Sequence, residues 1–292
     1  MVTDWWAAMR AGDFARARQI ADRLLAEQAA LGPCWHLPRH EQWVWDGRPL
    51  DSRRVLVRCY HGLGDTIQFA RFLPRLVDIA RAVVVWAQPR LLPLLASMQL
   101  PIELLPLHDG TPETDYEVDI ELMEVPHALR IDLASVPARV PYFCVPPGQR
   151  LASAFSLGGV AEAGDWDAKR SVPAELLGSL ADLPGLALFS LQLGEPVPGA
   201  TDISSADVLT VASRVRALDL VITPDTMMAH LAGALGVPTW TLLPAHADWR
   251  WMEDRTDSPW YPTMRLFRQP QPGDWAAVIS DVRTRLRGLV RG

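Results

Sequence analysis

Two short polar motifs, about 160 residues apart, carry the side chains best suited to chemistry. The first, HGLGDTIQ at residues 61–68, directly follows the apolar run 55–59, and the second, TPDTMMAH at 223–230, directly follows the run 218–222. Each pattern predicts a strand, a tight polar turn and a helix, which aims helix N-terminal N–H groups at the end of the strand. Two such turns, one in each half of the chain, predict two facing α/β domains with a ligand between them.

The first motif contains a turn and one carboxylate. Gly62 and Gly64 flank Leu63, and glycine permits both a sharp turn and the close approach of a ligand to backbone N–H groups. The motif is not GxGxxG, so a nicotinamide-dinucleotide site lacks its fingerprint. Asp65 has two interpretations: a helix N-cap, or a base at a cleft rim that accepts a proton from an incoming hydroxyl. The sequence leaves both open.

The second motif and a basic pair suggest an anion site. Asp225 is again a natural N-cap, and His230, one turn after Thr226, can face the same edge of the helix. The plainer interpretation of His230 is a satisfied, half-buried histidine. Lys169, the sole lysine, and Arg170 precede a predicted helix start, which fits a diphosphate clamp. A solvated basic pair is the alternative.

Helical and strand patterns must position these motifs. Residues 5–31 predict two helices broken at Gly12-Asp13, which resemble half of a tetratricopeptide unit. One such hairpin cannot form a solenoid, so we interpret it as a helical cap on the first domain, with docking of a partner protein as the alternative.

From residue 53 onward, strands and helices alternate. The first half comprises strands 54–59, 82–87 and 102–105, helices 66–80 and 89–98, and the segments 116–123 and 140–145; residues 146–165 form an interdomain passage. The second half comprises helices 173–180, 206–217, 226–235 and 275–289, with strands 186–191, 219–223 and 239–243. This alternation predicts a doubly wound sheet in each half. We therefore expect a hairpin and lead-in at 1–50 and Rossmann-like domains at 51–148 and 149–292.

Composition excludes several classes of protein. The 292-residue chain is 49% hydrophobic and 21% charged, with a net charge of −6, which argues against nucleic-acid binding and against attachment to a membrane by charge. Its three cysteines, Cys34, Cys59 and Cys144, lack the spacing of a disulfide framework or zinc site. No apolar run is long enough to span a membrane, and the N-terminus does not resemble a signal peptide. We expect a cytoplasmic protein.

The ordered series of motifs resembles glycosyltransferase family nine, the ADP-heptose:lipopolysaccharide heptosyltransferases. The segments that carry the resemblance are GLGDTIQFARFLP, DWDAKRSVP, SLQ, LDLVITPDTMMAHLAGALGVPTWTLLP and DWRWMEDRTDSPWYPTMRLFRQ. The similarity covers roughly residues 40–290 and is greatest to the tetratricopeptide-associated bacterial branch.

This resemblance implies a GT-B fold, an inverting mechanism, no obligatory metal or cofactor, and a nucleotide-diphosphate sugar, such as ADP-heptose, as donor. It assigns Asp65 as the general base that deprotonates the acceptor hydroxyl. Lys169 and Arg170 match the position that holds the donor phosphates. The remaining donor-binding candidates are Gly62, Gly64, Asp225, Thr226, Met227, His230 and, more weakly, Gln192 at a strand end.

The sequence also departs from the family. Residues 158–164 lack an expected aromatic, Met227 replaces a small residue and could narrow the donor pocket, and the tetratricopeptide array is reduced to one hairpin. The leading hypothesis is an inverting transferase that moves a sugar, with heptose as one candidate, to a saccharide or protein hydroxyl. The alternative is an inactive relative that binds a partner or a nucleotide sugar, with the hairpin and a tryptophan-rich loop as contact surfaces. Retention of Asp65, Lys169, Asp225 and His230 together favours the transferase.

Overall fold

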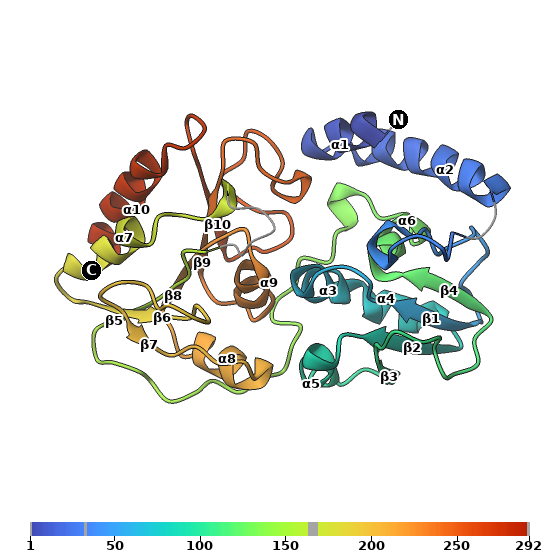
Figure 1. The fold of residues 1–292 in the computed structure, drawn as a ribbon, viewed down its shortest axis with the longest axis horizontal. Helices are drawn as coiled ribbons and strands as arrows, with labels where there is room; N and C mark the ends of the chain where they lie inside the picture. Colours follow the sequence, from blue (N-terminus) through green and yellow to red (C-terminus); the bar gives the residue numbers. More distant parts are fainter. Residues whose placement is uncertain (1, 32–33, 163–168, 291–292) are drawn as a thin grey trace. The chain divides into compact units, whose positions relative to one another are not determined.

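The chain contains two units, each with its own parallel sheet (Figure 1). The structure, a computed structural model, describes residues 2–31, 34–162 and 169–290. Unit 1 is Met1–Pro137 and unit 2 is Ala138–Gly292, so the division falls ahead of the 148/149 boundary suggested by the sequence. The predicted α/β class, with a Rossmann-like sheet in each half, is confirmed.

Unit 1 begins with the predicted helical hairpin, α1 (Val2–Arg10) and α2 (Phe14–Leu31). Gly12 makes the turn with a φ of 73°, a left-handed conformation that glycine adopts without strain. Asp22 on α2 accepts hydrogen bonds from His127 Nε2 at 2.7 Å and from Arg130 Nη1 at 2.5 Å. The hairpin is therefore attached to the remainder of unit 1, as expected of a cap.

The sheet of unit 1 places its first strand next to its last. Runs of valine, leucine and isoleucine form β1 (Arg54–Arg58), β2 (Ala82–Ala87), β3 (Ile102–Pro106) and β4 (Val118–Glu121). Among the described residues the strand order is β3-β2-β1-β4 and all pairs are parallel. The chain therefore winds in one direction from β1 to β3 and then crosses back to β4. The point at which this direction reverses, the topological switch point, lies between β1 and β4.

The helices of unit 1 are more interrupted than expected. The predicted helix 66–80 is split into α3 (Leu63–Phe69) and α4 (Leu73–Ile79) by a 3-10 turn, and Pro74 opens the second part. Proline suits the first turn of a helix because the N–H it lacks would have no partner there. The helix predicted at 89–98 is reduced to α5 (Leu92–Ala96), and α6 (Val125–Ala128) follows β4.

A strap formed by residues 34–50 covers one face of this sheet. Leu56, Val84 and Trp86 share that face. Arg39 of the strap lies over Trp86, with its guanidinium carbon 5.2 Å from the ring centre, and Trp35 stacks at 5.1 Å on Arg58 of β1. The strap therefore occupies a position that a helix would cover in a full doubly wound domain.

A buried carboxyl fixes the end of the strap. Glu124 Oε2 accepts hydrogen bonds from Trp45 N at 3.0 Å and from Glu121 N at 2.9 Å, and Oε1 is 3.4 Å from Val44 N. Burial is the main reason why the pKa of Glu124 rises to about 7, and the nearby Glu121 carboxyl adds to that rise while the backbone donors oppose it. The strap is thus joined to the segment that follows β4.

Unit 2 has a larger sheet with the same kind of reversal. Its strands are β5 (Phe155–Gly159), β6 (Leu186–Ser190), β7 (Thr201–Asp202), β8 (Leu220–Pro224), β9 (Thr239–Leu243) and β10 (Met264–Arg268). The described strands run in the order β10-β9-β8-β5-β6-β7, with all pairs parallel. The switch point lies between β5 and β8.

Three segments of unit 2 differ from expectation. Strand β5 lies inside the predicted passage 146–165, where Gly158 conceals the strand pattern; a Cβ there would lie 2.5 Å from Leu218 and 2.8 Å from Leu191, so close packing requires glycine. Strands β7 and β10 were not predicted. The segment 140–145 is not a strand, and Pro141 within it, like the prolines at 146 and 147, has no N–H to donate to a ladder. Residues 163 and 164 of the glycine-rich stretch lie outside the described residues.

Helices cover the unit 2 sheet. Helices α7 (Ala174–Gly178) and α10 (Trp275–Val290) lie together on one face, and α8 (Val208–Val215) and α9 (Met227–Ala234) lie away from them (Figure 1). The α10 side chains Trp275, Val278 and Ile279 join a core with strand residues such as Leu157 and Leu220. Among the described helices, none is both long enough and apolar enough to cross a membrane.

Candidate functional site

Each polar motif lies at the switch point of its own sheet. The turn at 61–65 follows β1, next to the end of β4, and the turn at 225–226 follows β8, next to the end of β5. Open α/β sheets bind ligands outside the carboxyl ends of their strands at this reversal, because the loops on either side separate there. The strand order therefore assigns one candidate half-site to each unit.

Asp65 stands in the first turn of α3. Gly62 is the N-cap of that helix, and Asp65, three residues later, accepts a hydrogen bond from Gly62 N to Oδ2 at 2.9 Å. The N-cap interpretation of Asp65 is therefore wrong in position, although its carboxylate does satisfy a backbone donor at the helix start. The side chain is half-buried.

The glycines of this turn are not explained by a left-handed backbone. Gly62 has φ −65° and ψ 163°, which any residue can adopt. A Cβ at Gly62 would lie 3.1 Å from Asp65 Oδ2, so glycine leaves space for the carboxylate. Gly64 is half-buried in the first turn of α3.

A second carboxylate in this half-site was missed by sequence reasoning. Glu121 ends β4, is 2% exposed, and accepts hydrogen bonds from Tyr60 N and Met123 N. His61 Nδ1 lies 3.0 Å from Glu121 Oε1, an ion-pair distance when the imidazole is protonated. Only the strand order brings these residues together, and nothing in the local sequence gives that order.

In unit 2, Thr226 caps the helix that Asp225 was expected to cap. Thr226 Oγ1 accepts a hydrogen bond from Met228 N at 3.1 Å and lies 3.0 Å from Thr223 Oγ1. Asp225, 6% exposed, is therefore not engaged as the cap. Its carboxyl belongs to a buried polar cluster beneath the start of α9.

Arg170 joins this cluster from a distant part of the chain. Its Nη1 donates to the Asp225 carbonyl at 2.8 Å and lies 3.7 Å from Asp225 Oδ2. Lys169, beside it, is exposed. The structure thus places Arg170 at the turn before α9. The preceding residues 165–168 lie outside the described residues.

His230 also faces Asp225. Its Nε2 lies 3.9 Å from Asp225 Oδ1, and its Nδ1 lies 3.0 Å from the Tyr261 hydroxyl. The imidazole stacks on Trp251, with ring centres 5.5 Å apart and an interplanar angle of 18°. At 4% exposed, His230 is more buried than the half-buried histidine of the plainer interpretation, and its neighbours include a motif carboxyl.

Opposing forces act on the Asp225 carboxyl. Burial raises its pKa and the nearby Asp248 carboxylate adds to that rise, while the interaction with the indole N–H of Trp251 and the charges of Arg170 and Arg250 partly counter it. Trp251 Nε1 is itself buried, and no acceptor among the described residues completes a hydrogen bond with it. Two arginines and an indole donor therefore surround one buried carboxyl.

Gln192 and Met227 occupy different surroundings. Gln192 Oε1 accepts hydrogen bonds from Ala161 N and Glu162 N, each at 3.0 Å, and its Nε2 donates to Glu195 O at 2.9 Å. Gln192 therefore holds the backbone that leaves β5. Met227 is the half-buried first residue of α9. Donor binding by either residue stays a prediction.

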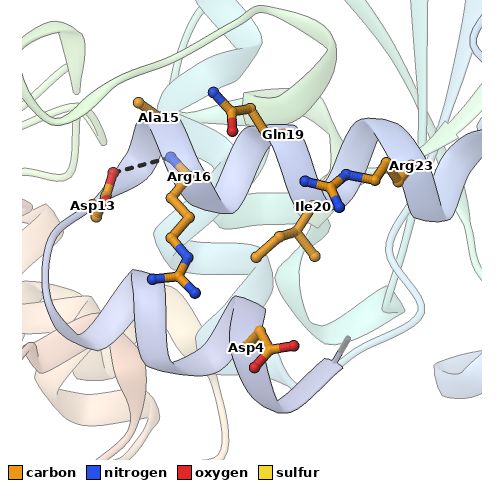
Figure 2. Close-up of a pocket in the computed structure, with 7 residues that line it drawn as sticks. All are labelled: Asp4, Asp13, Ala15, Arg16, Gln19, Ile20 and Arg23. Carbon is orange, nitrogen blue, oxygen red and sulfur yellow. Dashed lines mark hydrogen bonds between the residues drawn. The ribbon is translucent and has the colours of Figure 1, made fainter.

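The described residues contain no group of three histidine, cysteine, aspartate or glutamate side chains placed to hold a metal ion. A cavity of about 450 Å³ does occur between the two hairpin helices. Figure 2 shows its lining residues, Asp4, Asp13, Ala15, Arg16, Gln19, Ile20 and Arg23. Its two arginines are balanced by two aspartates, so the lining provides no net charge for a phosphate. The cavity includes no residue of the two motifs.

Comparisons with known proteins identify the fold of this chain. No protein-family profile matches the chain. Protein FlbA of Caulobacter vibrioides is 25% identical over 290 residues, an alignment that covers 83% of this chain and 48% of FlbA. The chain therefore spans about half the length of this curated relative.

Solved structures are similar over most of the chain. Escherichia coli ADP-heptose lipopolysaccharide heptosyltransferase II matches with a TM-score of 0.58 at 14% identity, over 81% of this chain and 98% of that chain. The dodecameric iron-containing glycosyltransferase TibC from enterotoxigenic E. coli gives 0.56 at 13%, over 82% and 78%. A family 9 glycosyl transferase from Veillonella parvula gives 0.52 at 13%, over 76% and 87%. The α/β fold with two parallel sheets is thus the fold of these GT-B enzymes.

Proposed function

We propose that this chain is an inverting glycosyltransferase that transfers a sugar from a nucleotide-diphosphate donor to a hydroxyl of a saccharide or protein. The observation that carries the proposal is the presence of one charged motif at the switch point of each sheet. A transferase with two substrates needs two binding positions, and the solved structures that share the fold include glycosyltransferases.

Unit 2 is the donor side in this proposal. A nucleoside diphosphate leaves with negative charge, so its departure is favoured by nearby cations and by N–H groups at a helix start. Lys169 and Arg170 supply cations beside the first turn of α9. Thr226, Met227 and the cluster of Asp225 and His230 complete this side.

Unit 1 is the acceptor side, and Asp65 is the base. The acceptor oxygen forms a bond to the anomeric carbon while the bond from that carbon to the donor phosphate oxygen breaks. The hydroxyl proton passes to the Asp65 carboxylate, and the diphosphate leaves with the electron pair. Attack from the face opposite the leaving group inverts the anomeric carbon.

One observation favours a second candidate function, an inactive nucleotide-sugar-binding protein. The Asp65 carboxylate already accepts the Gly62 N–H, a structural contact that would explain the residue without catalysis. The two functions differ in turnover and share donor binding.

A panel of nucleotide sugars separates the two functions. The protein is incubated with ADP-, UDP- and GDP-linked sugars, ADP-heptose included, with and without saccharide and peptide acceptors, and the released nucleotide is measured. We expect one donor class to be consumed faster in the presence of an acceptor. Tight donor binding without turnover on any acceptor would favour the binding protein, and a folded protein that binds no nucleoside diphosphate would contradict both.

A further inference from the structure

A tyrosine outside both motifs is hydrogen-bonded to His230 of the donor half-site. Tyr261 belongs to the loop before β10, and its side chain is fully buried. Its hydroxyl lies 3.0 Å from Nδ1 of His230, the imidazole nitrogen that faces away from Asp225. The pair therefore connects the loop before β10 to the turn before α9.

The packing leaves this tyrosine little freedom. A Cβ at Gly233, one turn after His230, would lie 2.6 Å from the Tyr261 ring, so the glycine provides the space in which the ring lies. Trp251 stacks on His230 at 5.5 Å. Stacking fixes the plane of the imidazole but does not decide whether Nε2 or the ring carbon Cε1 faces Asp225, because a ring flip preserves the stack and exchanges each nitrogen with a carbon. The Tyr261 hydroxyl supplies the directional contact.

The charges around Asp225 indicate where the imidazole proton lies. Arg170 Nη1 is 3.7 Å from the Asp225 carboxyl; Arg250 also acts on it, and the Asp248 carboxylate, which pairs with Arg250 at 2.9 Å, acts in the opposite sense. A carboxylate beside the Arg170 guanidinium favours a hydrogen, not a lone pair, on the facing nitrogen. His230 Nε2 then carries the proton and Nδ1 is an acceptor, so the Tyr261 hydroxyl donates.

We propose that Tyr261 is a positioning residue of the donor half-site: its hydroxyl donates to His230 Nδ1, keeps the proton on Nε2, and so orients the imidazole toward Asp225. Its effect on donor binding rests on the proposed function, because Asp225 in turn holds Arg170 through its carbonyl. Loss of the Tyr261 hydroxyl removes the contact to His230 Nδ1, so the imidazole is less firmly held against Asp225. The packing of the aromatic ring itself is unchanged.

The location of the proton is tested without any substrate. In protein labelled with ¹⁵N-histidine, nitrogen shifts identify the protonated nitrogen of each neutral imidazole at about pH 8. The spectrum of His230→Gln lacks the His230 signal, and this loss identifies that signal among those of the seven histidines. We expect Nε2–H at His230 in the wild type and a mixture of tautomers in Tyr261→Phe. Nδ1–H in the wild type, or an unchanged tautomer in Tyr261→Phe, overturns the proposal.

A matched control removes a different hydroxyl. The Tyr116 hydroxyl accepts a hydrogen bond from Arg58 Nη2 at 3.2 Å in unit 1, so Tyr116→Phe should leave the His230 signal unchanged. The wild-type spectrum tests the proton assignment by itself, so the proposal remains testable even when Tyr261→Phe does not fold.

Calorimetry with ADP tests the link to the donor. We expect Tyr261→Phe to weaken ADP binding roughly two- to tenfold, to raise KM for the donor more than it lowers kcat, and Tyr116→Phe to do neither. Unchanged ADP affinity together with a shifted tautomer overturns the link. Absence of ADP binding in the wild type contradicts ADP as the donor nucleotide, and the spectra still decide the role of Tyr261.

Discussion

Two aspartates follow parallel strands in this chain, and their surroundings differ at the scale of single residues. Asp65 is half-buried and accepts a backbone hydrogen bond from Gly62. Asp225 is buried, with Arg170 and His230 beside it. A partly exposed carboxylate can exchange a proton with an incoming hydroxyl, whereas a buried, charge-paired carboxyl is suited to holding other groups in place. The difference supports a base in unit 1 and a binding role in unit 2.

Asp65→Asn tests the base. Asparagine retains an acceptor oxygen for Gly62 N, so we expect the variant to fold with a free energy of unfolding within about 1 kcal/mol of wild type. Transfer should fall by about 10²–10⁴-fold, while ADP affinity stays within a few-fold. Turnover and calorimetry measure the two effects. Wild-type turnover in the folded variant would leave Asp65 with its structural contact alone.

Lys169 and Arg170 should respond differently to removal. Lys169 is exposed, so Lys169→Ala should weaken ADP binding without a change in melting temperature. Arg170→Ala also removes the hydrogen bond to the Asp225 carbonyl, so it should lower both affinity and melting temperature. Each charge-assisted phosphate contact is worth roughly 1.5–3 kcal/mol, and the double variant should bind most weakly. Wild-type affinity in the double variant would place the phosphate site elsewhere.

The sequence predicted residues that stand next to one another in a motif and missed those brought together by the sheet. Asp225 was singled out as a natural N-cap and His230 by its helix-turn spacing from Thr226, and the structure places the Asp225 carboxyl and the His230 imidazole 3.9 Å apart. Glu121 and Tyr261 were not identified as site residues, because each reaches its half-site through strand order or a long loop. Local periodicity contains no information on which strand ends become neighbours.

Whole elements depend on a few positions at which side-chain size or charge is critical. Helix α9 is buried from Met228 to Ala234, and Gly233 faces the Tyr261 ring. In unit 1, the strap depends on the carboxyl of Glu124. A substitution at Gly233 therefore tests how α9 is held in place, and a substitution at Glu124 tests how the strap is held.

Gly233→Ala should destabilise unit 2. The added methyl would meet the Tyr261 ring at 2.6 Å, and overpacking of this kind costs about 1–3 kcal/mol. Gly288, on α10, is the matched control because nothing lies within 4 Å of an added Cβ. Gly288→Ala should be neutral or stabilising by up to about 1 kcal/mol. Urea unfolding distinguishes the two, and equal stability changes would contradict the close contact.

Glu124 should make unit 1 less stable as the pH rises. Below the ordinary glutamate pKa both the folded and unfolded states hold the proton. Between that value and the folded pKa of about 7, the unfolded state releases the proton and the folded state retains it, so unfolding becomes easier. The loss is complete above about pH 7 and is on the order of 2–4 kcal/mol.

Urea unfolding between about pH 4.5 and 8 measures this effect against Glu124→Gln, which keeps one acceptor oxygen. The difference in unfolding free energy between the two proteins should shift in favour of the variant as the pH rises through this window. A difference that does not vary with pH would show that Glu124 does not titrate there.

At the scale of the whole molecule, each unit contains its own parallel sheet and core. Alternating strand and helix patterns were sufficient to predict this class, and β1, β2, β8 and β9 were found close to their predicted places. Strand β5 was missed because its two glycines are more typical of a loop, although packing against Leu191 and Leu218 requires glycine at position 158. Packing determines those residues, and sequence periodicity cannot reveal it.

Separate cores predict two thermal transitions, only one of which should respond to ADP. A ligand that binds one folded unit at 100 times its Kd adds about 2.7 kcal/mol to that unit. Differential scanning calorimetry should show the ADP shift in the transition that Gly233→Ala also lowers. The transition whose pH dependence changes in Glu124→Gln should not move. An ADP shift confined to that second transition would contradict donor binding by unit 2.

The strap at residues 34–50 has a consequence for how this protein can be divided. Its Trp35 covers Arg58 and its Arg39 covers Trp86, and the backbone N–H of Trp45 donates a hydrogen bond to the Glu124 carboxyl. A fragment that began at residue 51, where the sequence alone places the first Rossmann-like domain, would expose an apolar sheet face and invite aggregation. The smallest autonomous form of the first unit therefore includes the strap, and exchanging hairpins between relatives requires a junction ahead of Cys34.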